Sequence, residues 1–213
     1  MIRFVSLALM LLVGSAQGQA WAASAQEPRL GIDYEILPTP QALYGVGKGK
    51  IEVAEVFSYG CHFCAAFQPL VNDWQKKMPK RVRWEYVPAA FGGHWDTFAR
   101  AYFAADALGV RKRTHDAVFK AIFVDEVIKT GSPEEIADMY AKFGVDRAKF
   151  LAAMDNEIAT AKLAKAREFA LNTGISGTPT IILNGKYRIP VTRDRSYAGA
   201  IDTLNFLLAK EGL

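Results

Sequence analysis

The chain has 213 residues, of which 51% are hydrophobic and 23% charged, and its formal net charge is +4. This length and apolar content suffice for one filled core, or for one core with a helical satellite. So modest a charge argues against a nucleic-acid-binding specialist, and the basic clusters Arg111–Arg113 and Lys76–Lys77 are expected to be solvated helix ends.

The first residues have the layout of a secretory signal peptide. Met1–Arg3 gives a short positive start, Phe4–Val13 is an apolar run, and two A-x-A sites follow among small residues. A membrane anchor is the alternative, but a span needs about 20 apolar residues. We therefore expect residues 1–22 to be a signal peptide that is cleaved after Ala22 or Ala25, which predicts export of the mature chain.

The next segment predicts a strand, a helix and a second strand. Residues 26–48 are rich in proline and glycine, so we expect an extended arm with room for one short edge strand. Ile51–Ser58 is apolar and β-branched, as a strand requires. Apolar residues then recur at helical spacing over 63–78, and Arg81–Val87 alternates between apolar and polar side chains like a strand.

A helical block and a second β-rich segment follow. Residues 94–173 carry apolar stripes at helical spacing, and Ser132–Glu135 is a capping box with proline at the first helical position. Thr178–Leu183 predicts a strand that Asn184-Gly185, a strong hairpin signal, joins to a partner over 186–189. A last amphipathic helix includes residues 201–208, so the order is β–α–β, helical block, β–β–α.

The motif Cys61-His62-Phe63-Cys64 contains the only two cysteines of the chain. A structural disulfide that closes so small a loop would constrain the unfolded chain little, whereas a C-x-x-C between a strand and a helix is typical of a thioredoxin-like redox site. A zinc site is the alternative, but it needs four ligands, and the histidines and acids show no ligand spacing. We expect no metal, and we expect His94 and His115 to be ordinary surface or core residues.

Their positions predict different roles for the two cysteines. The unpaired N–H groups and the positive end of the helix dipole stabilise an anion at a helix start. Cys61 is therefore expected to be an exposed, low-pKa thiolate, and Cys64, one turn further on, to be more buried. His62 can add positive charge or a hydrogen bond beside the Cys61 thiolate, or else is a surface residue of modest effect. Phe63 is expected to shield the site or to touch substrate.

Gly177-Thr178-Pro179-Thr180 is the second element of the candidate site. A proline at the entrance of an interior strand is unusual, because it cannot donate to the ladder. A cis peptide between Thr178 and Pro179 would explain it, but most X–Pro bonds in folded proteins are trans. The residues alone therefore favour a trans proline that starts an edge strand.

These features together resemble the DsbA family of periplasmic thiol:disulfide interchange proteins. The likeness rests on the C-x-x-C motif behind Glu55–Tyr59, on Phe91–Gly93 and on Gly177–Tyr187, and it extends over nearly the whole mature chain. It implies an α/β, thioredoxin-like fold made of 26–93 and 174–213, with a large inserted helical domain over 94–173. It also implies that a cis-proline loop faces the cysteines, and that Thr178 and Pro179 bind an extended substrate through backbone hydrogen bonds of Thr178.

The sequence departs from the family pattern between the cysteines. The best-known members carry Cys-Pro-His-Cys, whereas His62 and Phe63 stand here. Because these two residues help to set the thiol pKa and the redox potential, the family's oxidising strength does not carry over. Glu55 matches a position where the family keeps a buried acid, which indicates a proton relay to Cys64. The alternative is an edge-strand carboxylate in solvent.

The resemblance implies a periplasmic dithiol oxidase that introduces disulfide bonds into unfolded exported proteins through a reversible Cys61–Cys64 disulfide. A membrane quinone-linked re-oxidase of the DsbB type would be its partner, no cofactor is required, and a monomer is expected. The first alternative is an isomerase or reductase on the same fold, although the roughly 25 residues between the predicted signal peptide and the first strand are too few for the dimerisation domain of periplasmic isomerases. The second is a non-catalytic peptide-binding or chaperone module.

Overall fold

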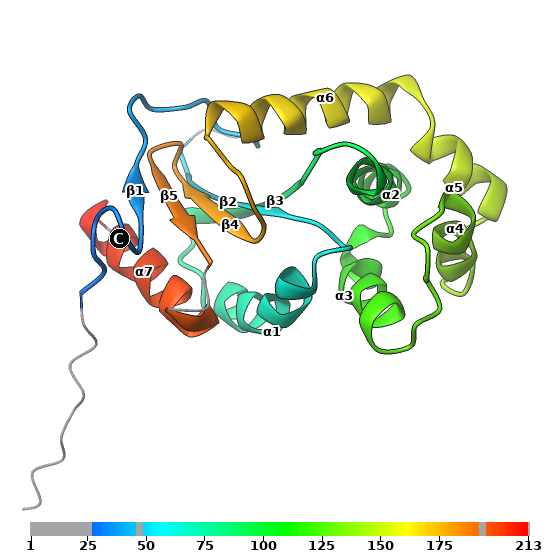
Figure 1. Cartoon of the computed structure of the whole chain (residues 1–213), viewed down its shortest axis with the longest axis horizontal. Coiled ribbons are helices and arrows are strands. Elements are labelled where there is room, and N and C mark those ends of the chain that lie inside the picture. The colour runs from blue at the N-terminus through cyan, green and yellow to red at the C-terminus, as the bar shows by residue number, and fades with distance from the viewer. Residues whose placement is uncertain (1–26, 46–48, 192–194, 213) are drawn as a thin grey trace, which may run out of the picture.

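A five-stranded mixed sheet lies at the centre of the molecule (Figure 1). The structure is a computed structural model that describes residues 27–45, 49–191 and 195–212. The predicted signal peptide and both of its cleavage sites lie outside these residues. The strands are β1 (Glu35–Ile36), β2 (Ile51–Phe57), β3 (Val82–Pro88), β4 (Thr180–Leu183) and β5 (Tyr187–Pro190), in the spatial order β1-β5-β4-β2-β3.

Strand β2 is an interior strand that leads directly to the cysteines. It pairs in parallel with β3 and antiparallel with β4. Its residues after Ile51 are all buried, as expected for an apolar, β-branched strand that is covered on both faces. The predicted extended arm contains the short edge strand β1, which pairs with β5.

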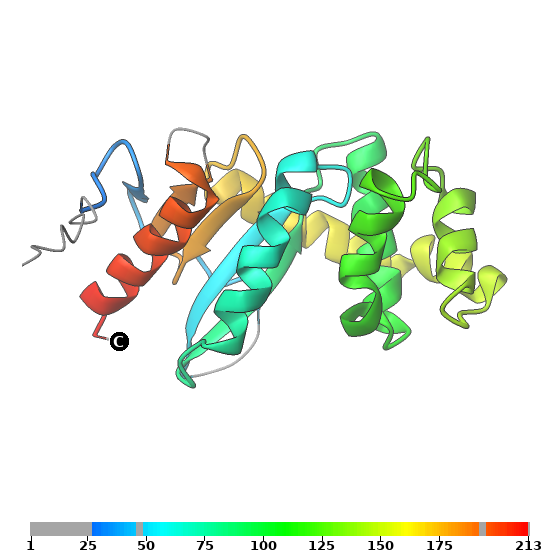
Figure 2. The same ribbon diagram turned by 90° about the horizontal axis from the view of Figure 1, so that it is seen from below.

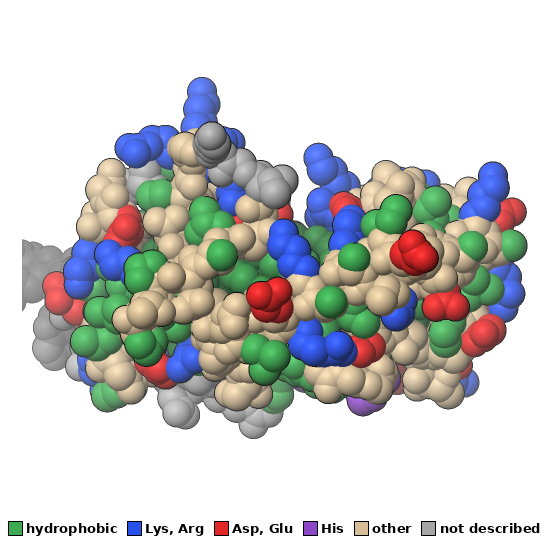
Figure 3. Space-filling model, turned by 90° about the horizontal axis from the view of Figure 1, so that it is seen from above, with side chains coloured by type: hydrophobic (Ala, Val, Ile, Leu, Met, Phe, Trp, Pro, Cys, Tyr) green, Lys and Arg blue, Asp and Glu red, His purple; other side chains and the backbone are tan. Residues whose placement is uncertain are grey.

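Helices cover both faces of the sheet. In Figure 1, α1 (His62–Lys76) and α7 (Ser196–Lys210) lie below it, and α6 (Glu157–Asn172) crosses above it. Phe67 and Val71 are the buried stripe of α1, as its helical periodicity predicts. Figure 3 shows the α6 side, where charged side chains of both signs are spread among hydrophobic ones.

Four further helices form a block beside the sheet. They are α2 (His94–Ala107), α3 (Arg111–Phe123), α4 (Pro133–Ala141) and α5 (Arg147–Met154). The Ser132 hydroxyl accepts a bond from the backbone N–H of Glu135 and so caps α4, as predicted. Among the residues that the structure describes, no helix combines the length and apolarity that crossing a membrane requires.

The block is connected to the sheet by α6, which begins beside α5 and returns over the sheet toward β4 (Figure 1). The fold is the thioredoxin-like α/β arrangement that was expected, with helices inserted between β3 and β4. The exact division into 26–93, 94–173 and 174–213 stays a prediction.

The β4–β5 hairpin matches the prediction at its turn, whereas both of its strands begin later than predicted. Asn184 and Gly185 both have positive φ, 51° and 64°, as a tight hairpin turn requires. Strand β4 begins at Thr180 rather than at Thr178. The two residues before it, Thr178 and Pro179, belong instead to the loop that faces the cysteines.

Candidate active site

Cys61 is the N-cap of α1, and its sulfur lies between the helix and the loop before β4. The Sγ atom accepts a hydrogen bond from the backbone N–H of Cys64 at 3.3 Å, and the thiol donates to the carbonyl oxygen of Thr178 at 3.4 Å. Both cysteines are free thiols. In Figure 2 the start of α1 and the loop before β4 lie along the same, upper edge of the molecule.

The two thiols differ in exposure and in acidity. Cys61 is 7% exposed and Cys64 is fully buried, so the predicted order holds, but Cys61 is much less open than expected because the Thr178 loop covers it. The hydrogen bond from the Cys64 thiol is the largest influence that lowers the pKa of Cys61 to about 6, helped by Thr178 and by the N–H groups of Cys64 and Phe63. Burial, followed by the neighbouring Cys61, raises the pKa of Cys64 well above its usual value.

The Thr178–Pro179 peptide bond is cis. The family resemblance implied this isomer, and the trans proline favoured by the residues alone was wrong. The Thr180 hydroxyl donates to the carbonyl of Gly177 at 2.8 Å, and the N–H of Val191 donates to the carbonyl of Pro179 at 3.3 Å. These bonds fix both sides of the loop, so the Thr178 carbonyl is held against Cys61.

His62 and Phe63 occupy the solvent side of the first turn of α1. Both are exposed, and the His62 ring makes edge-on contacts with Phe63 and with Phe123 of α3, at centroid distances of 6.0 and 5.5 Å. The ring of His62 therefore joins the active-site turn to the helical block. An effect of His62 on the pKa of the Cys61 thiol and a contact between Phe63 and substrate both stay predictions.

Glu55 lies in the middle of β2 and is 1% exposed. The alternative of a solvent-exposed edge carboxylate was therefore wrong. Within the described residues, neither carboxylate oxygen has a hydrogen bond of normal geometry. Burial is the main cause that raises the pKa of Glu55 to about 8, the Cys61 charge adds to it, and the Trp84 indole opposes both.

The sequence patterns did not predict a buried polar cluster around His115. His115 Nδ1 lies 2.9 Å from the Tyr59 hydroxyl, and its Nε2 lies 3.3 Å from Oε1 of Gln68. Burial lowers the pKa of His115 to about 3, so the ring is neutral. His115 is thus a core residue, as one of the two expectations had it, but it also connects α3 to the loop before Cys61. No local pattern signals this contact, because 56 residues separate His115 from Tyr59.

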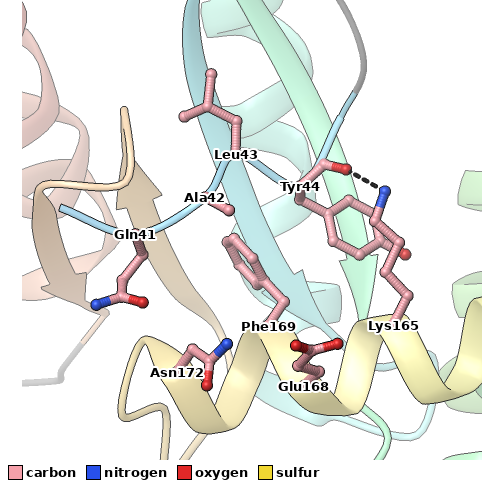
Figure 4. A pocket seen from close by; sticks show the side chains of 8 residues that line it. All are labelled: Gln41, Ala42, Leu43, Tyr44, Lys165, Glu168, Phe169 and Asn172. Atoms are coloured by element: carbon pink, nitrogen blue, oxygen red, sulfur yellow. Dashed lines mark hydrogen bonds between the residues drawn. The ribbon is translucent and has the colours of Figure 1, made fainter.

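A separate, small pocket lies beside α6, and none of the residues that line it belongs to the candidate active site. Figure 4 shows it between the arm segment Gln41–Tyr44 and α6. Lys165 Nζ donates to the carbonyl of Tyr44 at 2.7 Å, and Phe169 packs on the Tyr44 ring. In the part of the chain that the structure describes, no three His, Cys, Asp or Glu side chains are grouped as a metal site would need.

A C-x-x-C pair at a helix start, opposite a cis-proline loop, defines the class of thioredoxin-like thiol–disulfide oxidoreductases. The model of the family described as DSBA-like thioredoxin domain matches residues 52–202 of this chain. The chain belongs to this family, and it is a thiol:disulfide interchange oxidoreductase.

Named relatives agree over nearly the full length. The chain is 34% identical to the thiol:disulfide interchange protein DsbA of Pseudomonas aeruginosa, over 99% of this chain and 97% of the relative. It is 35% identical to DsbA of Azotobacter vinelandii, over 91% and 89%. The crystal structure of the oxidoreductase DsbA from Xylella fastidiosa superposes with a TM-score of 0.80 at 39% identity, covering 86% of this chain and 97% of that one.

Proposed function

We propose that this protein is a periplasmic dithiol oxidase that donates its Cys61–Cys64 disulfide to unfolded exported proteins. The observation that carries the proposal is the place of the Cys61 sulfur. It caps α1, accepts the Cys64 N–H and faces the Thr178 carbonyl. The helix start and the Cys64 N–H stabilise this sulfur as a thiolate, whereas the Thr178 carbonyl accepts only from the protonated thiol. A cysteine pair whose reduced form contains a stable thiolate gives up its disulfide readily.

In the first step a substrate thiolate attacks Sγ of Cys61. A substrate–Cys61 bond forms, the Cys61–Cys64 bond breaks, and Cys64 leaves with the electron pair. The pKa of Cys64 is raised by burial, so its thiolate must be protonated. The carboxyl of Glu55 has a pKa of about 8, so it is protonated at neutral pH and is our proposed proton donor.

In the second step another substrate thiolate attacks the substrate sulfur of the mixed disulfide. The substrate gains its disulfide, and Cys61 leaves as a thiolate. Its lowered pKa makes it the better leaving group of the pair. Thr178 and Pro179 hold the substrate backbone beside Cys61 during both steps, with His62 and Phe63 at the solvent side.

The cycle closes when the Cys61–Cys64 dithiol is oxidised again. We propose a membrane quinone-linked protein of the DsbB type as the oxidant, an exported monomer as the working form, and exported proteins with free thiols as the substrates. The name of the relatives, thiol:disulfide interchange protein, supports the exchange steps of this cycle. The predicted signal peptide supports its location.

The first test is the reduction potential of the Cys61–Cys64 pair, measured in glutathione buffers by alkylation and mass spectrometry. We expect a value nearer to the roughly −120 mV known for the strong oxidant DsbA than to the roughly −270 mV of thioredoxin. The ultraviolet absorbance of the thiolate should titrate with a midpoint near pH 6, the pKa of Cys61. A potential near that of thioredoxin would instead favour a reductase.

Two cysteine variants separate catalysis from mere binding. Cys61→Ser should abolish oxidation of a reduced test protein, because the attacked sulfur is gone. Cys64→Ser keeps that sulfur, so its Cys61 thiolate should attack a disulfide of an oxidised test protein and release one thiolate of that protein. The mixed disulfide should then accumulate, visible by mass spectrometry, because no Cys64 thiol is left to resolve it. Full activity of the Cys61 variant would contradict the mechanism. A disulfide that resists mild reductant in the unaltered protein, without any thiol oxidation, would indicate a peptide-binding module.

A further inference from the structure

A cavity of about 260 Å³ opens between α1 and the C-terminal end of α3. We call it the α1–α3 pocket. Its apolar walls are Ala65 and Pro69 of α1 together with Phe119, Phe123 and Val124, and its polar lining is Gln68, Asn72, Asp116 and Lys120. Val124 is 70% exposed at its mouth. The pocket is thus an apolar hollow at the junction between the sheet region and the helical block.

The pocket is continuous with the candidate active site. Ala65 and Pro69 follow the N-cap Cys61 at intervals of four residues, so all three lie along one side of α1. The His62 ring contacts Phe63 on one side and the pocket residue Phe123 on the other. An apolar surface therefore runs from the attacked sulfur, over the first turn of α1, into the pocket.

The polar groups around the pocket are engaged with one another. Lys120 Nζ pairs with Asp125 at 2.5 Å, and Asn72 Nδ2 donates to Asp116 at 2.7 Å. A charged guest would have to compete with these bonds, whereas an uncharged guest gains from burial on the apolar walls. Because Pro69 has no N–H, the backbone carbonyl of Ala65 lacks its usual helical donor. This carbonyl can therefore accept a hydrogen bond from a guest.

We propose that the α1–α3 pocket binds an apolar side chain of the substrate protein, two to four residues from the cysteine that attacks Cys61. This inference rests on the proposed function. Pro69 lies about 12 Å along α1 from Cys61 at 1.5 Å per residue, and an extended chain covers that distance in about four residues. In Figure 2 the loop before β4 and helix α3 lie on opposite sides of α1, so a bound chain straddles the helix start. The protein then prefers thiols that have an apolar neighbour.

The test uses short peptides with one cysteine and a single leucine placed from four residues before to four residues after it. In the parent peptide serine replaces the leucine. For each peptide the rate of mixed disulfide formation with the oxidised full-length protein is measured at limiting concentration. We expect one or two leucine positions to raise this rate about tenfold over serine, the lower end of what an apolar pocket contributes.

Val124→Asp places a charge at the mouth of the pocket. It should remove the preference for leucine and favour a lysine peptide at the same position. Leu171→Asp is the matched control, because Leu171 is an aliphatic residue of α6 with 74% exposure. It should leave the leucine-to-serine ratio as it is. Using the ratio within each protein cancels differences in overall reactivity, and circular dichroism checks that both variants fold.

The outcomes separate this inference from the proposed function. If the reduction potential of the unaltered protein is near that of thioredoxin, the proposed function fails. If the potential is near that of the strong oxidant, but leucine and serine peptides react alike at every position, the pocket inference alone is wrong. The same holds if Val124→Asp leaves the ratio unchanged, or if Leu171→Asp lowers it equally.

Discussion

Strand β2 buries one glutamate on each face of the sheet, and the two carboxylates differ in their hydrogen-bond partners. Glu52 and Glu55 are three residues apart, so their side chains point to opposite faces of the sheet, and both are almost fully buried. On one face, Glu52 accepts bonds of 2.7 Å from the N–H groups of Tyr44 and Gly45 and from Arg83. On the other face, Glu55 has no such bonds within the described chain.

The difference shows that partners, and not burial, decide what a buried acid does. The bonds of Glu52 fasten the N-terminal arm and β3 to β2, which is a structural role. Glu55 is left with burial as the main effect on its pKa, so it holds a proton near neutral pH at a cost to stability. Such a cost is typical of functional positions. Glu55 also lies close enough to Cys61 for the Cys61 charge to raise its pKa.

Removing the partnered acid should have the largest effect. Glu52→Ala removes the acceptor that Arg83 and two half-buried backbone N–H groups share, although Arg83 keeps its bond to the Gly45 carbonyl. Loss of one member of a buried ion pair costs about 3–5 kcal/mol, so urea unfolding should show a decrease in unfolding free energy of that size. Glu35→Ala is the control, because the Glu35–Arg188 pair is more exposed and such pairs contribute about 0–1 kcal/mol. Equal losses would contradict the comparison.

Removing the unpartnered acid should stabilise the protein. The pKa of Glu55 is raised from 4.5 to about 8 on folding, so the stability it contributes is complete below pH 4.5 and is lost as pH rises through 8. The loss is about 1.4 kcal/mol per pH unit in that window. Glu55→Gln cannot lose a proton, so reduced protein unfolded in urea should gain a few kcal/mol above pH 8 and little at pH 4.

The same variant should react more slowly, because Cys64 loses its proton donor. Mixed disulfide formation with a small thiol measures this step directly. The relay is wrong if Glu55→Gln reacts at the unaltered rate at every pH. An unfolding free energy with the same pH slope in both proteins would contradict the raised pKa.

The smallest effect is expected at Trp84, the residue whose indole lowers the pKa of Glu55. Trp84→Phe keeps the ring and removes the N–H, so the pKa of Glu55 should rise by less than about one unit. The pH profile of mixed disulfide formation should move upward by that amount. Trp74→Phe is the control, because the Trp74 ring packs on Trp84 while its N–H donates to Asn205. Identical shifts would mean that packing, not the N–H, is responsible.

Sequence patterns predicted the elements whose signals are local. The strand before the cysteines, the helix after them, the Asn184-Gly185 turn and the Ser132 cap follow from residues within one or two turns of each other. Pro69 is an exception, because a proline inside a helix usually breaks it, yet α1 continues to Lys76. Burial of the flanking Phe67 and Val71 outweighs this local preference.

The rest depends on contacts between distant segments. The loop that covers Cys61, the arm that holds Glu52 and the His115–Tyr59 bond each join residues that no periodicity connects. Family resemblance supplied the cis proline, which the residues alone did not favour. The roles of His62 and Phe63 and the signal peptide stay predictions, as does the exact extent of the helical insert.

The contact between Cys61 and Thr178 also determines when the candidate site can be completed during synthesis of the chain. The two residues are 117 positions apart, and synthesis at roughly 5–20 residues per second separates them by about 6–23 seconds. Through that interval the nascent chain carries both thiols without the loop that covers one of them. A chain that stops before Thr178 therefore has both cysteines but lacks the loop that packs against Cys61, and the candidate site is among the last features to be completed.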